Sequence, residues 1–589
     1  MRVLAFLRDA CRRAPGVVSV VGILMTLVAA LDALAVLSVV PLVDLILQTS
    51  GGQAGRPGFT AWMLAVGLSP SVGAILAIFL GVHVVRAGIQ VLAAYVTFRA
   101  RSTLLRDLMR GTFQDCLHAR WEFFTSREQA TLLHLFLREM IAVGDAFSGL
   151  VRIAAGTVQV VMYVVVPLYL SWQLTALSVT AGLLVAWPLA ALGRFSYRLG
   201  GRQVDAVGAL ASVFQQTFGA IKVVLAFGNQ QHAVTRFDRA FDAYDRSVVR
   251  AGTLSHSISP VYYPLGLSVV VLTLLAARQL QVPLSETAAV LYSLLRLFSI
   301  VGPLAVDKHL IDAFFAGYER ALELGRHARQ ARQPTGSRPF ETFQREIAFE
   351  SVSFAHPGRQ PTLVGINAQV RKGEFVAFVG ESGAGKSTLV DLLTGLHAPD
   401  VGRVAIDGSS LSDFDVASYR RRLGYVSQEP VLFNMSIRDN IRWASEDATD
   451  EDVAAACRQA NAVEFIEQLP DRYDTVVGDR GVRLSGGQVQ RIALARAMVR
   501  KPDLLILDEA TSALDSVSER LIQQAIEAIA RSTTVVAIAH RLSTISNADH
   551  IYVLSQGRIV EHGSYAALLE RDGAFTQMAG LQSLEAPPA

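Results

Sequence analysis

The chain has 589 residues, 51% of them hydrophobic, and its mean hydropathy of +0.36 is high for a soluble protein. Its 54 basic and 51 acidic residues leave a net charge of +3, so the composition gives no sign of a nucleic acid or another highly charged partner. The three cysteines, Cys11, Cys116 and Cys457, are too scattered to form a disulfide framework or a metal motif. Long uncharged runs lie within residues 1–310, whereas residues 345–589 have the composition of a globular domain.

Six apolar segments of the N-terminal half have about the 20 residues that a helix needs to cross a bilayer, or more. They are residues 17–47, 72–97, 153–170, 174–193, 257–277 and 287–306. The third, fourth and fifth contain no charged residue, and the others contain a few ionisable ones. The sequence therefore predicts a membrane domain of six helices within residues 1–325.

Arginines beside these segments predict the orientation, because short cytoplasmic flanks are rich in Arg and Lys. Clusters lie before the first segment and after the second and fourth: Arg2, Arg8, Arg12 and Arg13; Arg99, Arg101, Arg106 and Arg110; and Arg194, Arg198 and Arg202. We therefore expect a cytoplasmic N-terminus, and six crossings return the C-terminal domain to the cytoplasm. A cleaved signal peptide in residues 1–35 is the alternative, but its apolar stretch is about twice too long and its loss would leave five crossings.

The segments between the apolar runs also carry information. Residues 99–140 and 194–256 are amphipathic with a helical pattern, so we expect membrane helices to continue well past the bilayer. Residues 326–345 are rich in Arg, Gln and Pro without an apolar period, which predicts a linker. Residues 346–580 then form the second domain, and residues 581–589 form a tail.

A glycine-rich loop follows a predicted buried strand, residues 375–379, and precedes a predicted helix. It reads Gly380, Glu381, Ser382, Gly383, Ala384, Gly385, Lys386, Ser387 and Thr388. In this strand–loop–helix context the pattern predicts a phosphate-binding loop, whose backbone N–H groups and helix N-terminus face phosphate oxygens. Lys386 is expected to reach the β- and γ-phosphates, and Ser387 to offer a hydroxyl to Mg²⁺.

A second buried strand, residues 504–507, ends in two carboxylates. Asp508 is expected to hold Mg²⁺, and Glu509 to polarise the attacking water as a general base. Between the two motifs lies Leu484-Ser485-Gly486-Gly487-Gln488, whose hydroxyl and glycines at a helix N-terminus predict a second anion cradle. This order of motifs resembles the nucleotide-binding domain of the ATP-binding-cassette (ABC) family.

The resemblance extends over essentially the whole chain and implies the fold class. The first domain would be the all-α, six-helix membrane domain of ABC exporters, with short coupling helices near residues 121–124 and 218–222. The second would be an α/β, RecA-like P-loop ATPase domain with a helical subdomain. The implied activity is ATP hydrolysis coupled to transport, with ATP and Mg²⁺ as cofactors.

Three further residues match motifs of the family one at a time. Gln428 resembles the Q-loop glutamine, which senses Mg²⁺ and contacts the membrane domain. Residues Ser512 to Asp515 resemble the D-loop, which lines the interface between two ATPase domains, so Asp515 is implied at the nucleotide site. His540 resembles the switch histidine that holds the γ-phosphate.

Two positions depart from the family pattern. His356 stands where a tyrosine usually stacks on adenine, so we expect a different nucleotide affinity or pH dependence, unless Phe354 or another ring serves instead. Asp479 stands where a glutamate usually precedes the family's signature motif, which here is Leu484 to Gln488. Because aspartate keeps the negative charge of glutamate, we expect ATP hydrolysis to stay coupled to transport.

The resemblance also implies an assembly. In the family, the motif from Ser485 to Gln488 caps the ATP held by the P-loop of the other subunit. A chain with one P-loop, one signature motif and six membrane segments therefore implies a dimer. A homodimer with two competent sites is the simplest assembly, and a heterodimer with a related half-transporter is the alternative.

Three ionisable residues inside the apolar segments are candidates for substrate contact, because charges within a membrane are costly. They are Asp32, Arg86 and Arg296. A basic cavity suits a phosphate or pyrophosphate head, which guanidinium groups bind in a bidentate manner. The stretches 85–89 and 31–41 resemble exporters that flip lipid A or lipid-linked oligosaccharides.

We therefore expect ATP-driven export or flipping of an amphipathic lipid or lipid-linked glycan with an anionic head. We expect the protein to lie in a bacterial inner membrane, in contact with its lipids. Three alternatives stay open. Asp32 and Arg86 can form an ion pair that only stabilises packing. The substrate can be a drug or a hydrophobic peptide. The chain can be a membrane ATPase that acts as a gated channel or a regulator.

Overall fold

The computed structural model describes residues 15–48, 67, 71–125, 132–133, 135–510, 514–539 and 541–585. The chain divides into two compact units, Met1–Arg332 and Gln333–Ala589, which are taken separately below. The division falls inside the predicted linker of residues 326–345. A long helix continues to Gln330, however, so the first residues of that linker are helical rather than irregular.

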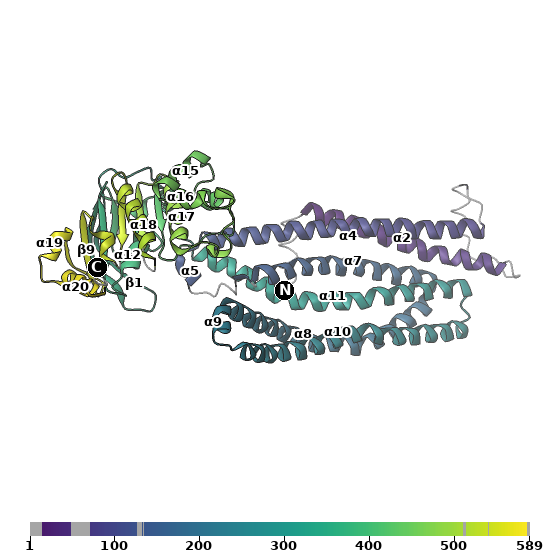
Figure 1. Ribbon diagram of the computed structural model, residues 1–589. Coiled ribbons are helices and arrows are strands. Elements are labelled where there is room, and N and C mark those ends of the chain that lie inside the picture. Colours follow the sequence, from purple (N-terminus) through teal and green to yellow (C-terminus); the bar gives the residue numbers. More distant parts are fainter. Residues whose placement is uncertain are drawn as a thin grey trace. The chain divides into compact units, whose positions relative to one another are not determined.

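Long helices make up most of the described part of the first unit (Figure 1). They are α2 (Pro15–Gln48), α4 (Val72–Leu117), α7 (Met140–Leu170), α8 (Trp172–Gly219), α10 (Gln230–Gln279) and α11 (Leu284–Gln330). Helices α4, α8, α10 and α11 have 46, 48, 50 and 47 residues. At 1.5 Å per residue each spans roughly 70 Å, about twice the thickness of a hydrocarbon core. The helices thus continue past the apolar segments, as the amphipathic flanks predict.

Four stretches among the described residues are long and apolar enough to cross a membrane. They are Ser19–Ile46, Val72–Leu117, Leu135–Leu170 and Leu284–Leu304. Helices α8 and α10 contribute shorter apolar stretches, Trp172–Leu184 and Gly266–Gln279. Large apolar side chains such as Val84 (72% exposed) and Leu184 (74% exposed) point away from the unit. Such an apolar exterior suits contact with lipid rather than water.

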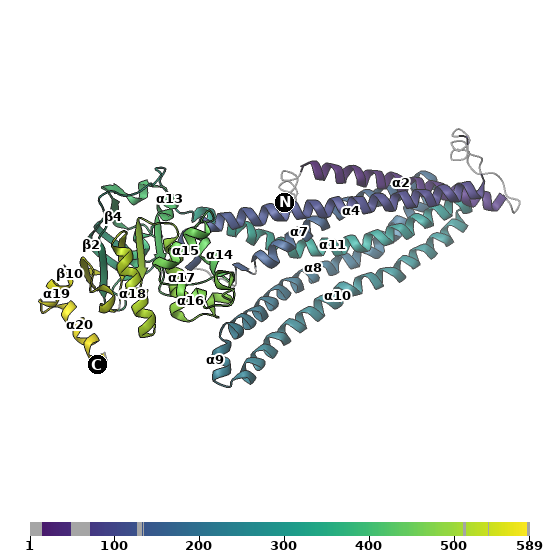
Figure 2. The ribbon, with the colours of Figure 1, turned by 45° about the horizontal axis from the view of Figure 1, so that its top comes forward.

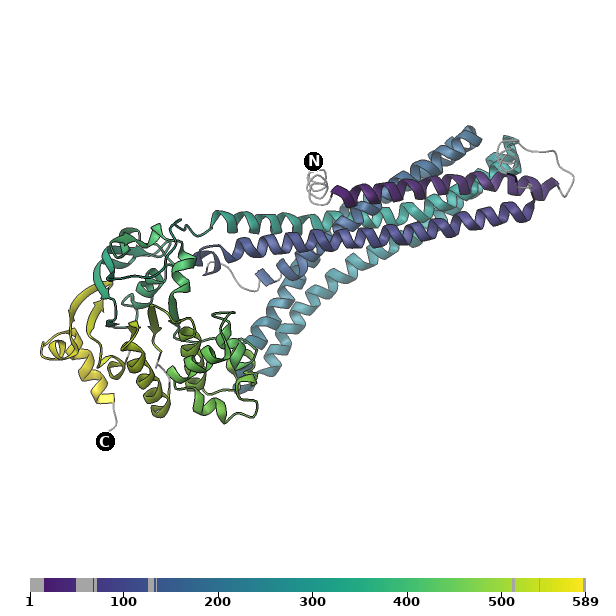
Figure 3. The same ribbon diagram turned by 90° about the horizontal axis from the view of Figure 1, so that it is seen from above.

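The long helices pack in pairs within this unit. Helix α7 packs along α11, α2 along α4, and α8 along α10. Helix α9 (Ile221–Ala226) joins α8 to α10, and Figures 2 and 3 show this pair separating from the other long helices towards α9. Two short helices lie between α4 and α7: α5 (Trp121–Thr125) and the π-helix η1 (Leu135–Glu139). Helices α5 and α9 lie at the two stretches where coupling helices are expected.

Two sheets form the second unit. An antiparallel sheet has the strand order β2-β1-β4-β5, and a six-stranded sheet has the order β10-β9-β3-β8-β7-β6. The strands are β1 (Glu346–Ala355), β2 (Pro361–Arg371), β3 (Phe375–Gly380), β4 (Val401–Ile406), β5 (Ser409–Ser410), β6 (Leu423–Val426), β7 (Leu504–Asp508), β8 (Thr534–Ile538), β9 (His550–Ser555) and β10 (Arg558–Gly563). In the larger sheet all neighbouring strands are parallel except β9 and β10. Strands β3, β7 and β8 are buried throughout, as uninterrupted apolar runs predict.

Helices cover the larger sheet and extend the unit. They are α12 (Lys386–Leu393), α13 (Val416–Arg421), α14 (Ile437–Arg442), α15 (Asp450–Gln459), α16 (Val463–Glu467), α17 (Gly486–Met498), α18 (Ser516–Ala530), α19 (Tyr565–Leu569) and α20 (Ala574–Glu585). Short 3₁₀ turns lie at Leu411–Asp413, Arg472–Asp474, Asp479–Gly481 and Leu542–Ile545. Apolar residues of α14 to α18 share one core with one face of the larger sheet, and a second core lies between the two sheets.

Candidate ATPase site

The P-loop and the two carboxylates lie at one edge of the larger sheet. The P-loop follows β3, and Asp508 is the last residue of β7. Strand β8 pairs in parallel with both of them, so the three carboxyl ends point in the same direction. Ligands of open α/β sheets bind at this edge. Residues more than a hundred positions apart thus reach one site through the order of the strands.

Lys386 holds the P-loop from within. Its side chain is 5% exposed, and its Nζ donates hydrogen bonds to the carbonyl oxygens of Gly380 (2.8 Å) and Glu381 (2.9 Å). Burial lowers the pKa of Lys386, and the charges of Glu509 and Asp508 act in the opposite direction. The ammonium group therefore sits close to carboxylates at the end of the loop, where a phosphate group would bring further negative charge.

Gly385 shows why this loop needs glycine. Its φ is +102°, a left-handed conformation that strains other residues. A Cβ atom at this position would also lie only 2.7 Å from Cδ2 of Leu363. Helix α12 begins directly after it at Lys386, followed by Ser387 and Thr388, so the first N–H groups of the helix border the loop. This arrangement suits an anion at the helix N-terminus.

Asp508 has the properties of a metal ligand. Burial raises its pKa to about 6, and the neighbouring charge of Glu509 adds to that effect. Its Oδ1 atom is buried and accepts no hydrogen bond from the described residues. Such an orphaned carboxylate oxygen is costly unless a cation binds it. Together with the hydroxyl of Ser387, this oxygen fits the oxygen-only coordination that Mg²⁺ prefers.

Glu509 and Gln428 contact each other. Glu509 has φ +49°, an unusual conformation that turns the chain directly after β7. Nε2 of Gln428, just beyond β6, donates a hydrogen bond of 2.6 Å to Oε2 of Glu509. The predicted base and the predicted Q-loop glutamine are therefore brought together, although 81 positions separate them.

The signature motif forms the N-terminus of α17. Ser485 is the N-cap: its Oγ accepts a hydrogen bond from the N–H of Gln488 (3.3 Å), while Oε1 of Gln488 accepts one from the N–H of Ser485 (2.9 Å). This capping box leaves the hydroxyl proton of Ser485 available to a ligand. Gly486 and Gly487 then follow as the first residues of α17, so the predicted cradle has the expected helix terminus.

Asp515 caps the next helix in a similar way. Its carboxylate accepts hydrogen bonds from the N–H groups of Val517 (3.1 Å) and Ser518 (2.9 Å), which begin α18. These bonds lower the pKa of Asp515. Ser512 at the start of the predicted D-loop and the predicted switch histidine, His540, lie outside the described residues.

His356 belongs to a small aromatic cluster beside α12. Its Nε2 lies 3.5 Å from Oγ1 of Thr388, and its ring lies 5.0 Å from that of Phe354 and 5.5 Å from that of His397. Phe354 is only 5% exposed, so His356 is the more accessible ring at this place. His397 is not among the residues predicted for this site. Its signal is weak, a single histidine just after the P-loop helix.

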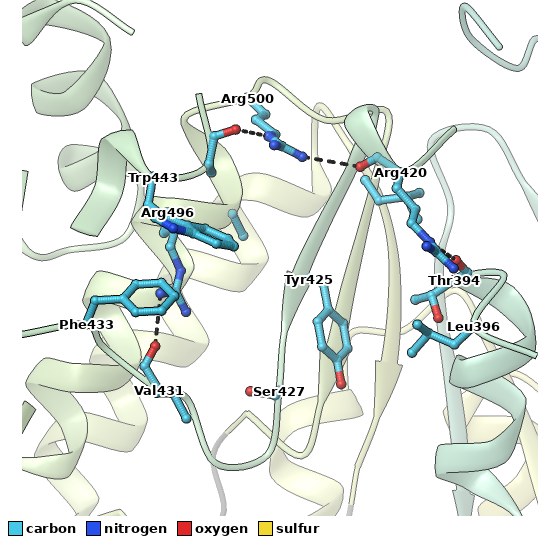
Figure 4. A pocket seen from close by; sticks show the side chains of 13 residues that line it. Thr394, Leu396, Arg420, Tyr425, Ser427, Val431, Phe433, Trp443, Arg496 and Arg500 are labelled. Atoms are coloured by element: carbon cyan, nitrogen blue, oxygen red, sulfur yellow. Dashed lines mark hydrogen bonds between the residues drawn. The ribbon is translucent and has the colours of Figure 1, made fainter. Parts of the chain in front are cut away.

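A groove also crosses the surface of this unit (Figure 4). Its volume is about 430 Å³, and its walls come from strand β6, helices α13 and α17, and the residues that follow α14, among others. Phe433 and Trp443 lie at one wall with their rings 4.9 Å apart, and Tyr425 faces them across the groove. Arg496 and Arg500 donate hydrogen bonds to backbone carbonyls, so their charges are fixed at the rim while the interior stays largely apolar.

The three candidate substrate residues lie in one polar region of the membrane unit, where the charge of Asp32 acts on both Arg86 and Arg296. Asp32 on α2 is 1% exposed and forms an ion pair with Arg86 on α4. From α7, the hydroxyl of Tyr163 (2.8 Å) and Nε2 of Gln159 (3.1 Å) donate hydrogen bonds to its carboxylate. The structure thus has the Asp32–Arg86 pair that the sequence left as an alternative.

Arg296 lies on α11. Its Nε donates a hydrogen bond to the hydroxyl of Tyr292 (3.1 Å), and that hydroxyl also lies 2.9 Å from Nε2 of His83. Among the described residues, Arg296 forms no ion pair with a carboxylate. It therefore differs from Arg86, whose charge is matched by Asp32.

A cavity of about 360 Å³ lies between α2, α4, α7 and α11. Its polar lining includes Gln159 and a bidentate ion pair in which Arg152 donates to both carboxylate oxygens of Asp307 (2.9 and 2.6 Å). Gln159, Tyr163 and Asp307 are not among the residues predicted to pair with charges in these helices. In the sequence, a single polar side chain within an apolar helix was the one sign that each of them pairs with another polar group.

Comparisons with known proteins agree with this architecture. Residues 363–512 match the family described as ABC transporter, and residues 18–299 match the ABC transporter transmembrane region. The heterocyst differentiation ATP-binding protein HepA of Nostoc sp. is 34% identical over 489 residues, which is 83% of this chain and 81% of the relative. An ATP-dependent lipid A-core flippase of Alkalilimnicola ehrlichii is 35% identical over 492 residues, or 81% of this chain and 82% of the relative.

A lipid A-core flippase of Haemophilus influenzae is 32% identical over 520 residues, covering 86% of this chain and 87% of the relative. A solved bacterial Atm1-family ABC exporter with ATP bound superposes with a TM-score of 0.81 at 28% identity, covering 98% and 99% of the two chains. Both the membrane and the ATPase parts are therefore matched. The chain belongs to the ABC transporter family, as a multi-pass membrane half-transporter of the exporter type whose ATPase domain drives export.

Proposed function

We propose that two copies of this chain form a homodimer in a bacterial inner membrane. The dimer uses ATP to flip or export an amphipathic lipid or lipid-linked glycan with a phosphate-bearing head. The observation that carries the proposal is the state of Arg296. Asp32 matches Arg86, and Asp307 matches Arg152, whereas Arg296 has only Tyr292 as its hydrogen-bond acceptor among the described residues.

A guanidinium group without an ion-paired carboxylate suits an anionic ligand. It has five N–H donors, and the bond to Tyr292 uses one of them. A phosphate group can accept two parallel hydrogen bonds from the remaining donors. The flippases among the relatives act on lipid A-core by name, which agrees with a lipid as cargo. A cavity for drug-like molecules would be expected to be more aromatic and less charged.

ATP hydrolysis is proposed to follow from the residues at the sheet edge. Lys386 and the first N–H groups of α12 would bind the phosphates, and Glu509 would orient and deprotonate the attacking water. Mg²⁺, held by Ser387 and Asp508, would neutralise charge on the β- and γ-phosphates. Gln428, which contacts Glu509, would report the state of this site to the membrane domain.

The tip of the α8–α10 pair supports a proposal for coupling. Around α9, Phe218 (65% exposed), Leu225 (56%) and Phe227 (75%) present apolar side chains. Exposed apolar groups of this kind need a partner. We propose that α9 is a coupling helix, through which closure of the ATPase domains moves the membrane helices.

The experiment compares the Arg296→Ala variant with the wild type in liposomes. Lipid A, with its phosphates, and enzymatically dephosphorylated lipid A serve as the two probes. We expect lipid A alone to stimulate wild-type ATPase, and the variant to lose this stimulation while it keeps its basal rate. Arg278→Ala, at an exposed position in the last turn of α10, is the matched control and should respond as the wild type does.

Two outcomes would contradict the proposal. If Arg296→Ala still responds to lipid A, Arg296 is not the anion receptor. If hydrophobic cations stimulate the wild type and lipid A does not, the chain is a multidrug exporter. Passive flux through a Glu509→Gln variant would instead indicate a gated channel.

A further inference from the structure

Arg491 lies one turn beyond the signature motif on α17 and is buried, with 7% of its surface exposed. Its Nε donates to the carbonyl oxygen of Gly487 (3.3 Å), and its Nη1 donates to that of Asn461 (2.9 Å). The guanidinium carbon also lies 4.6 Å from the ring centre of Phe465 on α16. A buried charge is costly unless several groups stabilise it. These three contacts do so, and they tie the backbone of the signature motif to the turn between α15 and α16.

Asn461 extends this connection to a third helix. It has φ +50°, a left-handed conformation that asparagine tolerates better than most residues. Its Nδ2 donates a hydrogen bond of 2.9 Å to the carbonyl oxygen of Leu521 on α18. Helix α18 is the one that Asp515 of the D-loop caps. A chain of hydrogen bonds therefore runs from Gly487 through Arg491 and Asn461 to the helix behind the D-loop.

A second contact joins the same two motifs directly. A Cβ atom on Gly487 would lie 2.3 Å from Oγ of Ser518, so the signature glycine packs against α18 with no room for a side chain. Ser518 is 8% exposed, and its N–H donates one of the two hydrogen bonds that the carboxylate of Asp515 accepts. Ser518 and Leu521 are three residues apart, so both contacts lie on one face of α18.

We propose that Arg491 and Asn461 are positioning residues that make the signature motif and the D-loop of one chain a single rigid unit. The inference rests on the proposed dimer, in which the signature motif faces ATP on the partner's P-loop. Loss of either residue would let the signature motif shift relative to the D-loop. The defect would then appear at the ATP that the partner binds, whereas the P-loop of the altered chain would stay intact.

Mixed dimers provide the test, because they separate the two ATP sites. One chain carries Lys386→Ala, so only the P-loop of the other chain hydrolyses ATP, completed by the signature motif of the Lys386→Ala chain. Arg491→Gln is then introduced into either chain, and kcat and KM for ATP are measured without transport substrate. Misplaced groups away from the reacting atoms cost up to about a hundredfold in rate.

We expect about a tenfold loss of kcat, with KM nearly unchanged, when Arg491→Gln is in the Lys386→Ala chain, and less than about a twofold loss when it is in the other chain. Equal losses in both arrangements would overturn the proposal, because they indicate a general folding defect. No loss in either arrangement would also overturn it. If the dimer itself is wrong, two differently tagged copies of the chain will not co-purify, which separates the two failures.

Two further variants keep the test independent of folding. Asn461→Gly tolerates φ +50° and keeps the carbonyl that Arg491 contacts, but loses the bond to Leu521. It should show the same dependence on placement with a smaller loss, about threefold in kcat. Arg491→Lys keeps the charge but cannot make both bonds of the guanidinium fork, so it should lie between wild type and Arg491→Gln. If Asn461→Gly lowers kcat equally in either chain of the mixed dimer, Asn461 does not position the signature motif.

Discussion

The ATPase domain and the membrane domain differ in how their charged residues find partners. In the ATPase domain, Lys386, Asp508 and Glu509 belong to short motifs at the ends of strands β3 and β7, so the neighbouring residues in the sequence already indicate their chemistry. In the membrane domain, Asp32 meets Gln159 and Tyr163, which lie 127 and 131 positions further along the chain. A charge inside a motif can thus be interpreted from sequence, whereas a charge inside a membrane helix can be interpreted only after its partners are known.

The Glu509→Gln variant tests whether the motifs of the ATPase domain have the chemistry that the sequence indicates. We expect ATP turnover to fall by about 10² to 10⁴-fold, because a general base contributes that much to a proton transfer. The variant should also accumulate a state in which the two ATPase domains hold ATP between them. Cross-linking of the two ATPase domains in the presence of ATP would detect this state. Glu570→Gln, at an exposed position after α19, is the control. Near-normal turnover of Glu509→Gln would remove this residue from the role of base.

The membrane domain gives the second test, through the stability of the Asp32–Arg86 pair. Arg86→Ala leaves a carboxylate that is 1% exposed without its cation, which typically costs about 3–5 kcal/mol. We expect a clear drop in the thermal unfolding midpoint, and we expect Asp32→Asn combined with Arg86→Ala to recover much of it. Arg296→Ala should change the midpoint less, since Arg296 interacts with Asp32 only at longer range and forms no ion pair with a described carboxylate. If Arg86→Ala is as stable as the wild type, the pair does not stabilise packing.

The same contrast explains how far the sequence could be interpreted. The order of P-loop, signature motif and acidic strand end predicted an α/β ATPase domain, and the parallel sheet brings those elements to one edge. Gln428 was recognised by resemblance, but its bond to Glu509 depends on β6 lying beside β7, which no local pattern encodes. Likewise, nothing near Arg152 in the sequence indicates Asp307, 155 positions away. Helix α11 also continues into the predicted linker, because an Arg- and Gln-rich stretch remains a good helix former until Pro334.

The contact between Gly487 and Ser518 tests whether the ATPase motifs depend on neighbours outside themselves. Gly487→Ala should clash with Ser518 and lower ATP turnover by about tenfold. Ser518→Gly removes the obstructing side chain, so the double variant should recover part of the activity, measured as kcat for ATP. Without recovery, the added methyl group of Gly487→Ala obstructs bound nucleotide instead, and the contact with α18 would not explain the glycine.

The smallest expected effect concerns the adenine position, where the ATPase domain departs from its family. His356→Tyr adds ring area at a place where Phe354 is buried beneath and Thr388 borders the ring. Because stacking free energy grows with the area that is buried, we expect KM for ATP to fall about threefold with kcat unchanged. His397→Phe, which keeps an aromatic ring beside His356, is the matched control and should change KM less. An unchanged KM for His356→Tyr would indicate that the base of ATP stacks elsewhere, and the correspondence between His356 and the family's tyrosine would then be wrong.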